Sequence, residues 1–335
     1  MSATTTLTPV GEKVQAFYEA NPFPAFDIAK YRTRDDVRER AGPYVKLLDR
    51  QLPHTAKIAD VGCGTGQLVN FLALRDKRNV IGVDFSAVSL GYARALKARL
   101  GLDNLTLLED NVLDLSLPSD TYDYVFCNGV LHHTGDAKRG FRHVARIVKP
   151  GGYLTVGLYN AYGRCVHGRM RWLSLHAGPV GQAIADWGIR RMLGDQYESF
   201  DIQKKRTWWA DQFNHPHETV HTIGEVLGWF DEYSLDYASS LPPIELGGDE
   251  AHVNLFPRQA KPPKTSAREL SAWLRQVQWI WQLRWTGGYF IVVGKKRTGV
   301  ERSSGRAVER SRGADVSPLD TRASEPKPLD ASAAS

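Results

Sequence analysis

Short apolar runs alternate with helical patterns between Lys57 and Asn160, and this alternation constrains the fold more than any other feature. The apolar runs are "KIADVG", "NVIGVDFS", "LTLLEDN", "YDYVFCNG" and "YLTVGLYN". The segments with helical spacing are "GQLVNFLALRD", "SAVSLGYARALKARLG" and "AKRGFRHVARIVKPGG". Strands that alternate with helices in this way predict an α/β fold, in which helices cover both faces of a parallel sheet.

The composition is that of a globular enzyme, with 42% hydrophobic and 24% charged residues among 335. No run of apolar residues is long enough for a transmembrane helix, and the N-terminus lacks the pattern of a secretory signal. The three cysteines are far apart, so we expect neither a disulfide framework nor a cysteine-rich metal site. We therefore expect a cytoplasmic protein.

The net charge of +6 raises the question of an anionic partner. Much of the excess lies in "GKKRTGVERSSGRAVERSRG", close to the C-terminus. The chain from Thr298 onward is rich in Ser, Ala, Pro and charge, which predicts a disordered, solvated tail at 298–335. A loose contact of this tail with RNA or anionic lipid is the alternative.

A glycine-rich segment, "ADVGCGTGQ", joins the first predicted strand to the first predicted helix. Glycines at such a turn let the backbone approach a ligand closely, and nucleotides bind at this edge of parallel sheets. The third position of the dinucleotide fingerprint is Gln67 rather than glycine. Asp60 precedes the loop, where a negative charge suits a cationic ligand better than a pyrophosphate. Asp84 ends the next strand, where a carboxylate can bind both ribose hydroxyls.

The ordered motifs "DVGCGTG", "VDFS", "EDNVLDLSLPSDTYDYVFCNGVLHH" and "KPGGYL" resemble those of the class I S-adenosylmethionine-dependent methyltransferases. The similarity is greatest to enzymes that act on quinones and secondary metabolites, and it extends from about Val14 to Lys296. It implies a Rossmann-like sheet of seven strands, mostly parallel, whose last strand is antiparallel. The implied cofactor is S-adenosyl-L-methionine.

The resemblance also implies roles for individual residues. Gly62, Gly64 and Gly66 would pass the methionine part of the cofactor, and Asp60 would help to hold its amino group. Asp84 would bind the ribose. The remaining expected cofactor contacts are Phe85, Asn111, Val112 and Asn128. Close helix–strand packing is the alternative role for the three glycines.

We expect an N-terminal helical strap at 1–56, a cofactor-binding core at 57–160 and a helical cap insertion at 161–221. Residues 222–297 would complete the sheet and carry a tryptophan-rich helix. The resemblance implies that an N-terminal helix covers the cofactor, and we expect Tyr18 to line this helix and to contact the substrate. Within the helix, spacing predicts that Trp273, Val277 and Trp281 form one packed face.

Several polar residues follow the predicted strands on the substrate side. His132 and His133 are candidate general bases near neutral pH. Tyr159 and Arg164 point toward the substrate in this interpretation. The cap combines arginines with tryptophans, which suits an acidic aromatic substrate, a lipid surface or RNA. Ordinary packing of the tryptophans and solvation of the arginines would give the same composition.

The segment "HPHETVH" contains a literal H-E-x-x-H, a pattern typical of zinc enzymes when it lies on a helix. Thr222 and Glu225 form a T-x-x-E capping box, so we expect the helix to begin after both histidines of the pattern. We therefore expect no metal site. Asp211, His215 and Glu218 are instead candidates for substrate binding or proton transfer, and a buried hydrogen-bonded turn is the alternative.

These observations predict methyl transfer to a small organic or lipid-like acceptor, at oxygen, nitrogen or carbon. An RNA or protein methyltransferase is the first alternative, although the chain lacks the Asn-Pro-Pro-aromatic and Pro-Cys motifs of base methylation. A cofactor-binding scaffold without activity is the second. We expect no stable nucleic-acid partner.

Overall fold

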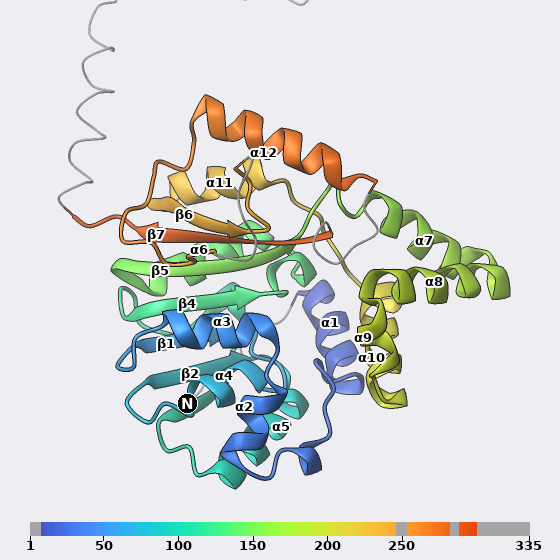
Figure 1. The fold of residues 1–335 in the computed structure, drawn as a ribbon, viewed down its shortest axis with the longest axis horizontal. Coiled ribbons are helices and arrows are strands. Elements are labelled where there is room, and N and C mark those ends of the chain that lie inside the picture. The colour runs from blue at the N-terminus through green and yellow to red at the C-terminus, as the bar shows by residue number, and fades with distance from the viewer. Residues whose placement is uncertain (1–7, 246–252, 282–287, 300–335) are drawn as a thin grey trace, which may run out of the picture. The chain divides into compact units, whose positions relative to one another are not determined.

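The computed structural model describes residues 8–245, 253–281 and 288–299. Its centre is a seven-stranded sheet in the order β3-β2-β1-β4-β5-β7-β6 (Figure 1). The strands are β1 (Lys57–Val61), β2 (Asn79–Asp84), β3 (Leu105–Glu109), β4 (Tyr122–Asn128), β5 (Val148–Tyr159), β6 (Leu235–Leu241) and β7 (Tyr289–Lys296). Strand β7 is antiparallel to both neighbours, and β1 to β5 pair in parallel. The predicted fold class is confirmed.

Alternate residues of each strand enter two separate hydrophobic cores, as the period of two in a strand requires. In β1, Ile58 packs into one core and Ala59 into the other. Helices on both faces complete these cores. They are α3 (Pro43–Gln51), α4 (Gln67–Leu72) and α5 (Ala87–Leu100) for the first, and α6 (Ala137–Ile147), α11 (Ile223–Glu232) and α12 (Ser266–Trp279) for the second.

Helices α1 (Pro9–Ala20), α2 (Arg34–Arg40) and α3 precede the sheet, with the short turn η1 (Ile28–Lys30) between α1 and α2. The part of the N-terminal strap between α1 and η1, residues 21–27, does not pack on the sheet edge. It packs on the glycine loop instead, because the Thr65 amide donates to Phe23 O at 3.2 Å and the Thr65 hydroxyl to Pro24 O at 2.8 Å.

The insertion after β5 consists of helices α7 (Cys165–His176), α8 (Gly178–Leu193), α9 (Asp195–Glu198) and α10 (Ile202–Trp209), and a π-helical turn η4 (Ala210–Asn214). Its two ends meet at the end of β5. The amide of Ala161 donates to His221 O at 3.0 Å, and the amide of His221 donates to Tyr159 O at 2.9 Å. The "HPHETVH" segment is therefore the returning end of this insertion.

Helix α11 begins where the capping residues predict. The Thr222 hydroxyl accepts the amide of Glu225 at 3.1 Å, and the first helical residue is Ile223. The histidines of the H-E-x-x-H pattern thus precede the helix. The carboxylate of Glu225 lies 3.1 Å from His221 Nδ1.

The predicted packed face of α12 was wrong. Trp273 is 49% exposed and Trp281 is 84% exposed, whereas Ala272, Gln276 and Trp279 are buried. The helix turns Gln276 inward because its side chain satisfies two buried groups. Its Oε1 accepts the amide of Ile223 and the side-chain amide of Asn160, both at 2.9 Å.

No helix within the described ranges is both long and apolar enough to cross a membrane. The tail expected to be disordered, 298–335, lies outside the described residues except for its first two.

Candidate active site

The glycine loop joins β1 to α4 at the C-terminal edge of the sheet. Gly64 has a φ of +55°, and a Cβ there would lie 2.3 Å from Phe23 O of the strap. Gly66 has a φ of +80°, and its Cβ would lie 2.4 Å from the Cβ of Ala93 in α5. Left-handed backbone and close neighbours both require glycine at these positions. Gly62 and Gly64 line a cavity, whereas the contacts of Gly66 are those of helix packing.

Asp84 fastens the loop to the end of β2. One carboxylate oxygen accepts the amide of Gly64 at 2.8 Å, and the other accepts the amide of Ser86 at 2.9 Å. The side chain is buried, and this burial raises its pKa despite the backbone hydrogen bonds that favour the carboxylate. Each oxygen keeps a lone pair that can accept a further hydrogen bond from a ligand.

Asp60 lies on the other side of the loop. Its carboxyl group is buried and has no hydrogen-bond partner in the described part of the chain. Burial and the nearby charge of Asp84 raise its pKa to about 7. Asn128, at the end of β4, donates to the Tyr44 hydroxyl at 3.3 Å, and its buried Oδ1 is unpaired among the described residues. Two acceptors without donors therefore face the same space.

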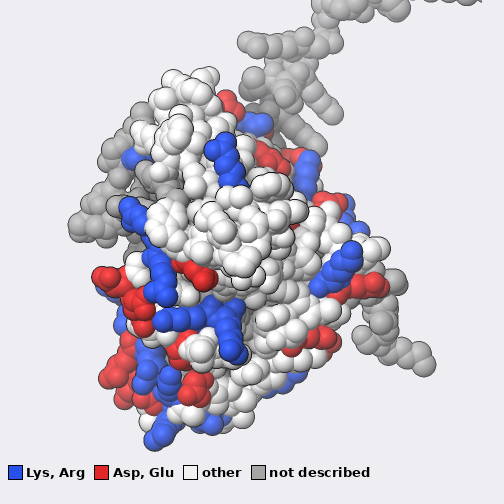
Figure 2. Space-filling view, turned by 90° about the vertical axis from the view of Figure 1, so that its right-hand side faces the viewer, with Lys and Arg blue, Asp and Glu red and all other residues white. Residues whose placement is uncertain are grey.

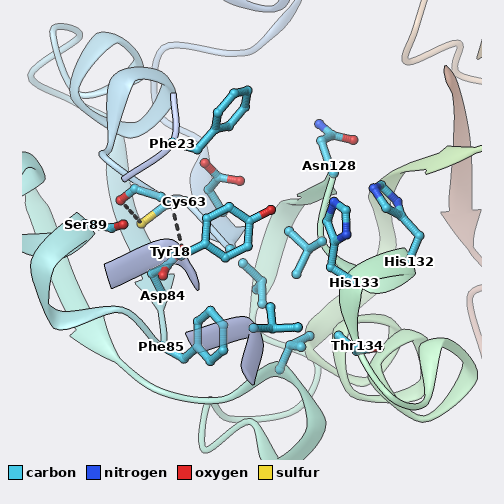
Figure 3. Close-up of a pocket in the computed structure, with 18 of the residues that line it drawn as sticks. Tyr18, Phe23, Cys63, Asp84, Phe85, Ser89, Asn128, His132, His133 and Thr134 are labelled. Carbon is cyan, nitrogen blue, oxygen red and sulfur yellow. Dashed lines mark hydrogen bonds between the residues drawn. The ribbon is translucent and has the colours of Figure 1, made fainter. Parts of the chain in front are cut away.

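All these groups open into one cavity of about 640 Å³. Its opposite wall carries His132 and His133 from the turn η3 (Leu131–His133), together with Tyr159 from β5. Tyr18 of α1 stands between the two walls, with Asp84 and Phe85 on one side and the histidines on the other (Figure 3). The cavity thus brings a nucleotide-type loop and a histidine wall together.

A family model described as a methyltransferase domain matches residues 58–152, from β1 into β5. The match covers less than a third of the chain, and it indicates a methyltransferase domain of the class I S-adenosylmethionine-dependent type from β1 into β5. The cofactor of this family is S-adenosyl-L-methionine.

The chain is also similar in sequence to curated methyltransferases and in fold to a solved structure. A ubiquinone biosynthesis O-methyltransferase of Cronobacter sakazakii is 29% identical over 54% of this chain and 61% of its own. A demethylmenaquinone methyltransferase of Bacillus pumilus is 34% identical over 30% of this chain and 44% of its own. The first two curated relatives are matched over 47% and 61% of their length, so the chain spans about half of them. PKMT2 from Rickettsia typhi, in complex with AdoHcy, shares the fold with a TM-score of 0.55 at 16% identity, over 77% of this chain and 54% of that one.

The residues that line the cavity fit S-adenosyl-L-methionine chemically. An unpaired carboxyl at Asp60 and an unpaired carbonyl at Asn128 suit an ammonium group, and Asp84 retains acceptor capacity for hydroxyls. Phe85, Asn111 and Val112 line the same cavity beyond Asp84. The Oδ1 of Asn111 already accepts the amide of Leu113 at 2.9 Å, so one lone pair remains for a ligand.

The histidine wall of the cavity is buried and neutral near pH 7. Burial lowers the pKa of His133 to about 3 and that of His215 to about 2, and it lowers the pKa of His132 well below its usual range. His133 Nδ1 lies 3.0 Å from His217 O. Because a carbonyl only accepts, Nδ1 carries the proton and Nε2 is free to take one. Neither ring nitrogen of His132 has a partner in the described ranges.

A buried polar network supports this wall. Asp211 accepts the Tyr18 hydroxyl at 3.3 Å, and Gln212 Nε2 donates to Asp211 at 2.9 Å and to the Tyr159 hydroxyl at 3.0 Å. Burial raises the pKa of Asp211 to about 6. Arg164 donates to Gln212 at 2.8 Å. The sequence pattern could not single out Gln212, since no motif marks it.

The structure separates the expected substrate contacts into two groups. Tyr18, Tyr159 and Asp211 line the cavity. Arg164 and Glu218 lie behind it as a buried ion pair at 2.7 Å, with the guanidinium of Arg164 over the Tyr159 ring at 3.7 Å. His215 also lies behind the wall, and its ring centroid is 3.7 Å from that of His133. These three residues support lining residues.

Two tyrosines line the cavity without having been expected. Tyr44 comes from α3 and Tyr289 from β7, and burial raises the pKa of both hydroxyls. Their neighbours in sequence carry no motif, so only the tertiary fold brings them here. No group of three or more metal-binding side chains occurs among the residues that the structure describes.

Proposed function

We propose that this chain transfers a methyl group from S-adenosyl-L-methionine to a small organic or lipid-like acceptor held against the histidine wall. The observation that carries the proposal is the single cavity that joins Asp60, Asp84 and the glycine loop to His133 and Tyr159. When bound, the cofactor supplies an electrophilic methyl group on a sulfonium. A nucleophile placed in line with that group needs mainly orientation for reaction.

Each end of the cavity has a proposed task. Asp84 accepts hydrogen bonds from the ribose hydroxyls, while Asp60 and Asn128 hold the ammonium group. Phe85, Asn111 and Val112 flank the adenine. Gly62 and Gly64 bring the backbone of the loop to the cavity wall beside the methionine chain.

His133 is the proposed general base. Its Nδ1 proton is fixed on His217 O, so Nε2 can accept the proton that a hydroxyl acceptor loses. Asp211 is the second candidate, because it is a carboxylate above pH 6 and already accepts the Tyr18 hydroxyl. The unpaired nitrogens of His132 supply a further polar contact for the acceptor.

The remaining lining favours an apolar acceptor with few polar groups. Residues from five helices and strands and from two loops contribute apolar surface: Val14, Phe23, Val45, Leu68, Val130, Leu241 and Ile291. The two relatives named for ubiquinone and menaquinone support a ring with a hydroxyl group or an activated ring carbon. A free base at His133 favours oxygen over carbon.

Protein methylation is the second candidate function. A protein arginine N-methyltransferase of Chlamydomonas reinhardtii is 27% identical over 37% of this chain and 36% of its own. The buried position of both histidines argues for an acceptor that enters the cavity rather than a folded surface. A cytoplasmic location and the absence of a stable nucleic-acid partner stay predictions.

The test incubates the full chain with methyl-labelled S-adenosyl-L-methionine and a cell lysate, which is then separated into lipid, small-molecule, protein and RNA fractions. We expect label in the lipid or small-molecule fraction. Asp84→Asn should abolish it, and Asp103→Asn, which changes an exposed carboxylate, should not. Label confined to protein or RNA would overturn the acceptor class. Absence of label in every fraction would overturn the proposal.

A further inference from the structure

Helices α7 and α8 form an antiparallel hairpin that projects beside the sheet (Figure 1). Its two helices pack closely, since a Cβ at Gly181 would lie 1.9 Å from Leu173 O and one at Gly188 would lie 2.0 Å from the terminal carbon of Met170. Met170, Ala185 and Ile189 fill its inner side against Phe213. The hairpin is therefore a firmly packed element, and the apolar side chains on its inner face are already buried.

The outer side of the hairpin exposes large apolar side chains. Trp172 is 60% exposed, Leu175 55%, Val180 67% and Trp187 56%. Between the two tryptophans, residues 173–186 contain one charged residue, Asp186 beside Trp187. Monomeric proteins rarely leave large apolar side chains clustered on one protruding tip without a partner.

The charge at the base of the hairpin is strongly one-sided. Residues 165–193 hold four arginines, at 169, 171, 190 and 191, and one acid, Asp186, which gives a net charge of +3. Arg169 and Arg191 are exposed. Figure 2 faces the side from which the hairpin projects, and it shows a broad uncharged area with both basic and acidic side chains at its edges.

We propose that the α7–α8 tip docks into the surface of a membrane that contains anionic lipid. Leu175 and Val180 enter the acyl boundary, and the two tryptophans lie at headgroup level, which amphipathic aromatic rings prefer. Arg169 and Arg191 contact lipid phosphates, with their alkyl stems along the apolar surface.

The charge pattern favours this occupant over the alternatives. Two copies of the tip would bring together equal positive charges, and RNA bound to the arginines would leave the apolar side chains of the tip in water. The hairpin is also tied to the cavity wall, because Arg171 donates to the carbonyls of Phe213 and His215. Docking does not depend on methyl transfer, so this proposal can fail while the proposed function stands.

The experiment measures sedimentation of the full chain with vesicles of phosphatidylcholine, alone or mixed equally with phosphatidylglycerol. We expect binding to the mixed vesicles. Trp172→Ala with Trp187→Ala should weaken it roughly tenfold or more, since burial of each ring contributes over 1 kcal/mol. Trp273→Ala, which removes a tryptophan of similar exposure on α12, should bind like the unchanged protein.

A second set of variants tests the role of charge by comparing two double variants of equal net charge. Arg169→Glu with Arg191→Glu should weaken binding by about fivefold or more for each residue, and raised salt should remove this difference. Lys77→Glu with Lys97→Glu, outside the hairpin, should have little effect. Melting curves and binding of S-adenosylhomocysteine, measured on every variant, should be unchanged.

Three outcomes would overturn the proposal. The first is no binding to the mixed vesicles. The second is an equal loss in the tip variants and their controls. The third is a dimer, seen by light scattering without vesicles, that the tryptophan variant converts to a monomer, because the tip would then bind a second copy.

Discussion

Protonation of the single residue Asp60 should make cofactor binding depend on pH. Its pKa of about 7 means that the free protein carries the proton below neutral pH. An ammonium group binds the carboxylate, so cofactor affinity should fall by up to tenfold per pH unit below about 7 and level off above it. Titration calorimetry from pH 5.5 to 8.5 measures this. Asp60→Asn should flatten the profile, whereas Asp103→Asn should not.

The same proton affects stability. The folded pKa of about 7 exceeds the ordinary value of 3.8, so the folded ligand-free chain retains a proton that the unfolded chain has lost. Asp60 therefore lowers the free energy of unfolding as pH rises between these values. A pH-independent cofactor affinity in the unchanged protein would contradict a protonated Asp60.

His133 should matter for turnover more than for cofactor binding. His133→Gln removes the base and should lower kcat by about 10²–10⁴ with cofactor affinity retained. Because its pKa is lowered to about 3, His133 itself should add no titration to the rate between pH 5 and 8. His54→Gln, an exposed histidine before β1, is the matched control. Equal rates in both variants would leave Asp211 as the base.

For single residues, the sequence predicts a place in the site correctly where the residue lies near the C-terminal end of a strand. Asp60, Asp84 and Asn128 lie on neighbouring parallel strands, so their side chains had to meet at one edge. Gln212, Tyr44 and Tyr289 could not be predicted. They reach the cavity from a π-helical turn, a helix before the sheet and the antiparallel strand, and no local pattern encodes that meeting.

The strap and the glycine loop should behave as one element. Gly64→Ala would place a Cβ 2.3 Å from Phe23 O at a positive φ, whereas Gly101→Ala has a similar φ with nothing within 4 Å. We expect Gly101→Ala to cost about 1–2 kcal/mol of unfolding free energy. Gly64→Ala should cost more than about 3 kcal/mol and abolish cofactor binding. Urea denaturation measures both, and equal costs would contradict the contact with the strap.

Helix α12 should depend on Gln276 rather than on its tryptophans. Gln276→Leu leaves the Ile223 amide and the Asn160 side chain without their acceptor, so we expect a loss of about 2–4 kcal/mol. Gln278→Leu, on the exposed side, should change stability by less than about 0.5 kcal/mol. Urea denaturation of the two variants measures these losses, and similar midpoints would contradict the role of Gln276 as a buried hydrogen-bond acceptor.

This helix shows why element faces are harder to predict than element types. Apolar spacing placed Trp273 and Trp281 inside, but the buried stripe is offset from them by one position. Hydrogen-bonding demand from Asn160 and Ile223, distant in sequence, decides which side of the helix faces the sheet. The sequence of the helix itself does not reveal which distant groups need a hydrogen-bond acceptor.

At the scale of the whole molecule, the sequence predicts the sheet and its glycine loop, but it does not predict how the other segments complete the cavity. Alternation of strands and helices determines the order of the sheet, and the sheet positions the cofactor loop. The histidine wall from η3 and β5 is completed by Asp211 of the insertion and Tyr18 of the N-terminal strap. These segments share no motif with each other, so their meeting over one cavity follows only from the fold.

The central claim is that this cavity holds S-adenosyl-L-methionine with its reactive end toward the histidine wall. A crystal structure of the full chain with S-adenosylhomocysteine tests it most directly. We expect one molecule in the cavity, with the ribose hydroxyls on Asp84, the ammonium group at Asp60 and the sulfur facing the side of His133. A ligand bound elsewhere, or one whose sulfur faces away from His133, would contradict the account.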